Sequence, residues 1–123
     1  MESAILVYGA NGYTGRLIAR LAVERKIDVV LAGRSEDKVR VLAEELSLPW
    51  RAFGLDDAAA LDAVLSEFGV VLNCAGPFSR TFRPMAKACL RVKAHYLDIT
   101  GEIGVFERAA RMGDEARKAG VMV

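Results

Sequence analysis

The sequence has few of the residues that mark disulfide-bonded, metal-binding or membrane-spanning proteins. Its 123 residues include two cysteines, one histidine, one tryptophan and three prolines. Cys74 and Cys89 show no Cys-x-x-Cys spacing, and the single histidine is far from both, so we expect reduced thiols and no metal site. No apolar run approaches the roughly 20 residues that span a bilayer, and the first residues do not resemble a signal peptide. These absences favour a cytoplasmic protein.

An excess of charge of either sign is also missing. The 17 Lys and Arg residues nearly balance 16 Asp and Glu residues, for a net charge of +1. This balance argues against nucleic acid or an anionic membrane as the main partner. Hydrophobic residues make up 53% of the chain, which is enough to build the core of one domain over residues 1–123. We therefore expect a single folded domain that binds a small molecule.

A glycine-rich turn near the N-terminus organises the rest of the chain. The apolar run 4–8 predicts a strand, and apolar residues at helical spacing over 17–22 predict a helix. The N-terminus of a helix offers unbonded N–H groups, and glycines let a phosphate approach the backbone closely. The turn therefore predicts a binding site for the pyrophosphate of a dinucleotide, although packing alone is an alternative. Its residues are Gly9, Ala10, Asn11, Gly12, Tyr13, Thr14 and Gly15.

Strand and helix patterns alternate along the whole chain. Strands are predicted at 4–8, 28–33, 50–54, 69–75, 95–99 and 121–123. Helical stripes lie between them, and we expect Pro84 to open the fourth helix near its first turn. Short loops and right-handed crossovers then predict an α/β fold, with a doubly wound parallel sheet between two helical layers. The expected strand order is 3-2-1-4-5-6, with the ligand at the carboxyl ends of the first and fourth strands.

The end of the second strand indicates which dinucleotide is bound. An NAD site usually has an acidic residue about 20 residues after the glycines, but this strand ends with Gly33, Arg34 and Ser35. Arg34 can bind a 2′-phosphate through two parallel hydrogen bonds and stack on adenine, and Gly33 leaves room for the phosphate. We therefore expect NADP(H), with NAD(H) also possible. The alternative is that Arg34 is a surface residue at a helix start.

Further candidates follow the third and fourth strands. Asp56 could accept a hydrogen bond from the adenine amino group, and either Asp56 or Asp57 could cap the next helix. Cys74, Ala75, Gly76 and Pro77 are expected to pass beneath the cofactor. Cys74 is better explained as a small apolar thiol than as a nucleophile, because no nearby basic residue would lower its pKa.

Substrate contacts are expected at the same edge of the sheet. The candidates are Ser79, Arg80, Thr100 and Glu102. No tyrosine is followed four residues later by a lysine, so the proton donor of short-chain dehydrogenases is missing. The sequence therefore assigns no catalytic residue.

Four motifs together resemble the N-terminal domain of the saccharopine dehydrogenase-like family, which includes the trans-acting enoyl reductases. They are GANGYTGR at 9–16, LAGR at 31–34, LNCAGPF at 72–78 and YLDITGE at 96–102. The resemblance implies a Rossmann domain that binds NAD(P)(H), with the glycine turn on the pyrophosphate and Arg34 on the ribose phosphate. It also implies a second, α+β domain for substrate binding and dimerisation, of which this chain would be the N-terminal partner.

Two functions and one mode of assembly are compatible with these features. We favour the cofactor domain of an oxidoreductase that transfers a hydride between nicotinamide and a small-molecule or lipid substrate. A regulatory dinucleotide-sensing module is the alternative, although such modules usually carry Gly-x-Gly-x-x-Gly and an acidic residue after the second strand. The strand predicted at 121–123 would leave an unpaired edge, which predicts self-association.

Overall fold

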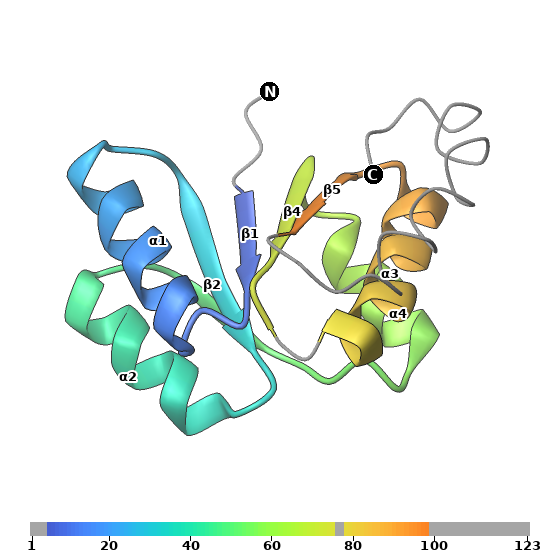
Figure 1. The fold of residues 1–123 in the computed structure, drawn as a ribbon, viewed down its shortest axis with the longest axis horizontal. Helices are drawn as coiled ribbons and strands as arrows, with labels where there is room; N and C mark the ends of the chain where they lie inside the picture. Colours follow the sequence, from blue (N-terminus) through green and yellow to red (C-terminus); the bar gives the residue numbers. More distant parts are fainter. Residues whose placement is uncertain (1–4, 76–77, 99–123) are drawn as a thin grey trace.

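A computed structural model describes residues 5–75 and 78–98, in which strands and helices alternate (Figure 1). The strands are β1 (Ile5–Tyr8), β2 (Val29–Gly33), β3 (Trp50–Ala52), β4 (Val70–Asn73) and β5 (His95–Asp98). The helices are α1 (Tyr13–Glu24), α2 (Glu36–Leu46), α3 (Ala58–Leu65) and α4 (Phe78–Val92). The strand predicted at 121–123 and the helix before it lie outside the described residues.

The five strands form one parallel sheet in the order β3-β2-β1-β4-β5. Val7 in the central strand β1 is in register with Leu31 of β2 and Leu72 of β4. The Rossmann-like fold and the predicted order of the first five strands are thereby confirmed. From β1 the chain adds β2 and β3 on one side. It then crosses back and adds β4 and β5 on the other side, so the direction of strand addition reverses between β1 and β4.

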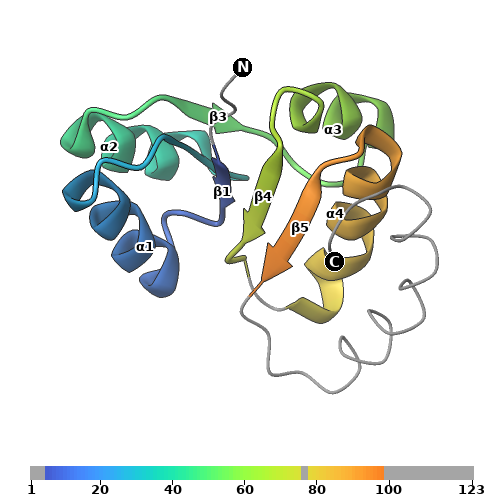
Figure 2. The same cartoon turned by 90° about the horizontal axis from the view of Figure 1, so that it is seen from above.

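Two cores cover the two faces of this sheet. Successive residues of a strand point to opposite faces, and β1 shows the consequence. Leu6 and Tyr8 pack in the core beneath α3 and α4, whereas Val7 packs in the core beneath α1 and α2. Figure 2 shows these helix pairs on opposite sides of the sheet. A central strand buried on both faces explains why its sequence is apolar throughout.

The start of α4 differs from the sequence prediction. Pro84 does not open this helix but lies inside it, because α4 begins at Phe78. An internal proline removes one helical hydrogen bond and costs about 3 kcal/mol. Phe82, Met85 and Cys89 lie on one buried face of α4 with at most 1% of each exposed. Burying such side chains stabilises a helix by about 1.5–3 kcal/mol each, which offsets the proline.

The structure shows which of two aspartates, Asp56 or Asp57, caps the N-terminus of α3. The Ala60 N–H donates to Asp57 Oδ1 at 3.1 Å, so Asp57 is the N-cap of α3. Asp56 is therefore not needed for this cap. Ser35 occupies the N-cap position of α2, but its side chain makes no capping hydrogen bond. Within the described part of the chain, no helix is long and apolar enough to cross a membrane.

Candidate functional site

The three glycines of the β1–α1 turn have different roles. Gly9 has φ +80°, and a Cβ there would lie 2.6 Å from the backbone nitrogen of Ala75. A Cβ at Gly15 would lie 2.3 Å from the carbonyl oxygen of Gly9. Both glycines therefore permit close backbone packing. At Gly12, by contrast, the nearest atom to a Cβ would be the Gly9 carbonyl oxygen at 3.4 Å, an ordinary van der Waals contact, so this position can accept a small side chain.

Gly12 also leaves the N-terminus of α1 uncovered. It is the N-cap residue of α1 and has no side chain to bond the first-turn N–H groups. The first N–H groups of a helix have no acceptor within the helix. Arg16 Nε donates to the Asn11 carbonyl at 3.0 Å and fastens the turn from outside. The result is a fixed turn with backbone donors available to an anion.

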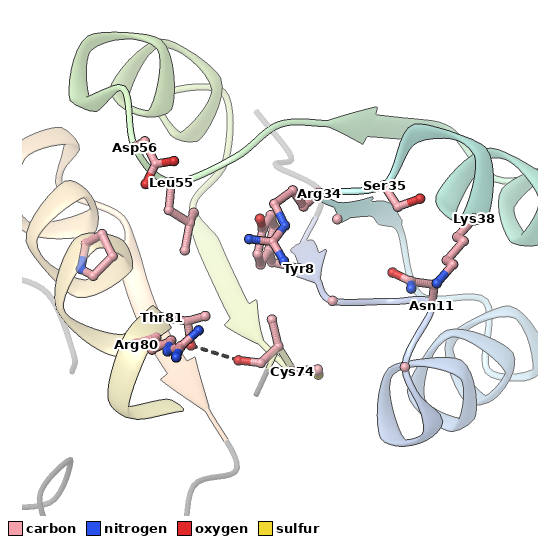
Figure 3. A pocket seen from close by; sticks show the side chains of 15 residues that line it. Tyr8, Asn11, Arg34, Ser35, Lys38, Leu55, Asp56, Cys74, Arg80 and Thr81 are labelled. Atoms are coloured by element: carbon pink, nitrogen blue, oxygen red, sulfur yellow. Dashed lines mark hydrogen bonds between the residues drawn. The ribbon is translucent and has the colours of Figure 1, made fainter. Parts of the chain in front are cut away.

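A cavity of about 600 Å³ opens beside this turn, at the carboxyl ends of β1, β2 and β4 (Figure 3). Its volume suits a small-molecule ligand. Most of the predicted cofactor residues line it, together with one predicted substrate residue. These are Gly9, Asn11, Gly12, Gly33, Arg34, Ser35, Asp56, Cys74, Ala75 and Arg80.

Several predicted residues are not brought to the cavity wall. Ala10, Tyr13, Thr14 and Gly15 do not line it. Ala10 is fully buried in the core beneath α1 and α2, whereas 82% of Tyr13 is exposed. Other predicted positions lie outside the described part of the chain, namely Gly76, Pro77, Thr100, Glu102 and the side chain of Ser79.

A positively charged end of the cavity is formed where β2 passes into α2. Figure 3 shows Asn11, Ser35 and Lys38 gathered on this side, with Arg34 between them and Asp56. Lys38 was not predicted as a site residue from the sequence, although its spacing from Ser35 puts the two one turn apart on the same helix face. Arg34, Ser35 and Lys38 thus offer two cations and an uncommitted hydroxyl to an anionic group.

Gly33 has a packing role at this end of the cavity. A Cβ on Gly33 would lie 2.7 Å from Val39 Cγ2 and 2.9 Å from Asn11 Oδ1. The room that the glycine leaves is therefore taken by these two side chains rather than by open space. As a result, the glycine turn and the β2–α2 loop are held against each other.

Tyr8, at the end of β1, also lines the cavity beside Arg34 and was not predicted as a site residue from the sequence. Its hydroxyl donates to the Phe53 carbonyl at 2.9 Å, and the two rings lie 5.1 Å apart. These contacts anchor the loop that carries Asp56 into the cavity wall. Burial raises the pKa of Tyr8, the Arg34 charge opposes this and the Asp56 charge adds to it. Tyr8 therefore remains a neutral hydroxyl at physiological pH.

The two cysteines behave as apolar thiols. Cys74 is half-buried in the cavity wall, and burial followed by the charge of Asp98 raises its pKa to about 11. Cys89 is buried, and burial followed by the charge of Asp62 raises its pKa to about 12. The thiolate is the nucleophilic form of cysteine, so neither side chain is activated in this arrangement.

Among residues 5–75 and 78–98, no three His, Cys, Asp or Glu side chains are grouped as metal ligands would be. The functional features of this region are instead an open helix N-terminus, a positively charged loop and a cavity between them. This combination suits an anionic ligand of nucleotide size.

Comparisons with known proteins agree with this geometry. The family model described as "Saccharopine dehydrogenase NADP binding domain" matches residues 5–123. A trans-acting enoyl reductase of Mycobacterium leprae is 36% identical over 109 residues, covering 83% of this chain and 26% of that protein. A saccharopine dehydrogenase-like oxidoreductase of Homo sapiens is 29% identical over 117 residues, covering 80% of this chain and 27% of that protein.

A solved structure shows the same fold. The apo saccharopine dehydrogenase (L-Glu forming) of Saccharomyces cerevisiae matches with a TM-score of 0.82 and 21% identity, over 98% of this chain and 26% of that one. The chain thus spans about a quarter of the length of these three proteins. Since the family model covers residues 5–123, the chain belongs to the saccharopine dehydrogenase NADP-binding domain family.

Proposed function

We propose that this chain is the NADP(H)-binding domain of an oxidoreductase that transfers a hydride between nicotinamide and a small-molecule or lipid substrate. The observation that carries the proposal is one cavity with two places for anions. The uncapped N-terminus of α1 suits the pyrophosphate, and the loop after β2 suits a 2′-phosphate. The family of NADP-binding domains to which the chain belongs supports the same cofactor.

The loop after β2 favours the phosphorylated cofactor for an electrostatic reason. Arg34 and Lys38 both line the cavity, whereas Glu36 and Asp37 between them are exposed and do not. Asp37 pairs instead with Arg40 at 3.3 Å. An acidic residue would bind both ribose hydroxyls of NAD, but two cations and the Ser35 hydroxyl fit a dianionic phosphate.

The adenine is proposed to lie between Arg34 and the loop after β3. The guanidinium plane can stack on the base, and Leu55 offers an apolar contact in the cavity wall. Asp56 lines the same wall and is not committed to the α3 cap. We therefore propose that its carboxylate accepts a hydrogen bond from the adenine amino group.

We propose that hydride transfer also requires parts of the protein outside the cofactor site. The cofactor supplies the redox chemistry, and the protein orients it beside a substrate. Arg80 lines the cavity across from Lys38 and is proposed to hold an anionic group of the substrate or cofactor. The relatives are named as a reductase and an oxidoreductase and extend well beyond the matched region. We therefore propose a further domain for substrate binding and dimerisation.

Two free thiols support a cytoplasmic location as part of this proposal. Cys74 and Cys89 are unpaired with each other, and cytosolic thiols are kept reduced. The alternative of a regulatory module gains no support from the relatives, since both are named for redox activities.

Titration of the purified protein with NADPH and NADH tests the proposal. We expect NADPH to bind at least about tenfold more tightly, because only it carries the phosphate that Arg34 can bind. NADPH binding no stronger than in buffer controls would refute the cofactor assignment. Equal affinity for both cofactors would refute the role of the loop after β2.

A further inference from the structure

Asn73 is the polar residue that the described core buries completely. It ends β4, and none of its surface is exposed. Its side-chain amide donates to Thr81 Oγ1 at 3.0 Å and to the Tyr96 hydroxyl at 3.1 Å. Its Oδ1 accepts from the Ala75 N–H at 3.0 Å. A buried amide is costly unless its hydrogen bonds are made, and these contacts make them.

Two of these groups hold the turn that follows β4. The Asn73 side chain accepts a hydrogen bond from the N–H of Ala75. The Thr81 hydroxyl donates to the carbonyl oxygen of Ala75 at 2.7 Å, which is the dashed line in Figure 3. Ala75 is therefore held by both its donor and its acceptor. Because Asn73 also bonds to Thr81, the three residues form a closed set of hydrogen bonds. Such satisfied networks make a buried region rigid.

The position of Ala75 matters for the glycine turn. The backbone of Ala75 lies so close to Gly9 that a Cβ on Gly9 would be 2.6 Å from the Ala75 nitrogen. The Cys74 N–H also donates to the Tyr8 carbonyl at 2.8 Å. The turn after β4 thus lies directly against the turn that faces the pyrophosphate. Any movement of Ala75 would change the width of the cavity at this point.

We propose that Asn73 and Thr81 are positioning residues that set the cavity wall under the pyrophosphate and nicotinamide-ribose half of NADP(H). The proposal rests on the proposed function above. Asn73 does not line the cavity and acts through Ala75, whereas Thr81 lies in the wall beside it. The adenosine half is held elsewhere, by the loops after β2 and β3. Loosening Ala75 should therefore weaken the binding of the whole cofactor but not the binding of its adenosine 2′-phosphate fragment.

Two substitutions at Thr81 test this assignment. Thr81→Val keeps the shape but removes the hydroxyl, and Thr81→Ser restores it. We expect Thr81→Val to raise the dissociation constant for NADPH about tenfold, the upper range for loss of a neutral hydrogen bond. The affinity for 2′,5′-ADP should stay within about twofold. Thr81→Ser should bind both ligands like the wild type.

Tyr96→Phe is the matched control. Tyr96 binds the same Asn73 amide, donates to Asp98 Oδ2 at 2.7 Å and does not line the cavity. Its loss should lower the melting temperature and leave NADPH affinity unchanged, since both contacts to Ala75 remain. Amide hydrogen exchange measured by NMR separates positioning from direct contact. The Ala75 N–H should exchange faster in unliganded Thr81→Val, but not in Tyr96→Phe.

Three outcomes would overturn the assignment. Wild-type NADPH affinity in Thr81→Val would show that the turn does not need the hydroxyl. Weakened NADPH binding with unchanged exchange at Ala75 would mean that Thr81 contacts the cofactor directly. Equal losses for NADPH and 2′,5′-ADP would indicate general loosening of the fold. If the wild type binds 2′,5′-ADP but Thr81→Val fails these criteria, the proposed function stands without the inference. A wild type that binds neither ligand overturns both.

Discussion

Removal of the Arg34 side chain should weaken the binding of NADPH much more than the binding of NADH. Arg34 lines the cavity beside Ser35 and Lys38, and a guanidinium can form two parallel hydrogen bonds to a phosphate. A hydrogen bond to a charged group contributes about 1.5–3 kcal/mol. At 1.36 kcal/mol per tenfold change, Arg34→Ala should weaken NADPH binding about 10- to 150-fold. NADH, which has no 2′-phosphate, should lose only the smaller affinity that stacking of Arg34 on adenine contributes.

Lys38 should contribute less than Arg34 because its ammonium acts as a point charge, without the two parallel hydrogen bonds that a guanidinium can make to a phosphate. Two unit charges about 4 Å apart in water interact by about 1 kcal/mol. Lys38→Met should therefore weaken NADPH binding about fivefold at low salt, and this loss should shrink as salt screens the charge. Lys38→Arg should preserve the charge and most of the affinity.

Arg40→Ala is the control for these changes. Arg40 lies on the same helix and pairs with Asp37 at 3.3 Å, but it does not line the cavity. It should leave both cofactor affinities unchanged when measured by quenching of protein fluorescence or by calorimetry. If Arg34→Ala weakened NADPH and NADH equally, Arg34 would serve the shared adenosine and not the 2′-phosphate. An unchanged NADPH affinity would refute the placement of the phosphate altogether.

Three further predictions follow from local geometry. Gly15→Ala should strongly lower the melting temperature because its Cβ would meet the Gly9 carbonyl at 2.3 Å, whereas Gly12→Ala should remain folded with weaker NADPH binding. Asp57→Ala should reduce the free energy of unfolding by about 1 kcal/mol through loss of the α3 cap, whereas Asp56→Ala should leave stability unchanged in chemical denaturation. The Cys74 pKa near 11 means that the thiolate fraction rises only at high pH, so its alkylation rate should still increase between pH 9 and 11. A rate that levels off near pH 9 would contradict that prediction.

The central strands were predictable because their environment leaves a simple pattern. β1 and β2 are covered on both faces, so each is a continuous apolar run that ends at a glycine or the residue before one. The beginning of α4 was not predictable in the same way. Pro84 suits a first helical turn, and only the packed face formed by Phe82, Met85 and Cys89 shows why the helix starts earlier.

The candidate site likewise contains residues that could be predicted from local sequence motifs and residues that could not. Arg34 and Gly12 were predictable because they lie next to the end of a strand or the start of a helix, where the sequence motif is local. Asn73 and its partners were not, since Tyr96 reaches Asn73 only once β5 pairs with β4, and Thr81 reaches it only once α4 packs beside β4. Asp56 and Asp57 were both suitable caps by sequence, and only the hydrogen bond to the Ala60 N–H distinguishes them.

The contacts around Gly9 are made within the protein, so we expect the proposed cofactor site to be formed before the ligand binds. Gly9 touches Ala75, and Ala75 is held at its N–H by Asn73 and at its carbonyl by Thr81. The backbone entropy of this turn is therefore lost when the protein folds, not when the cofactor arrives. Binding to a preformed site avoids this entropy cost, so the contacts that order the turn increase the affinity for the cofactor. At Gly12 a Cβ would make only a van der Waals contact with the Gly9 carbonyl oxygen at 3.4 Å, and we propose that the cofactor fills the space beside this residue.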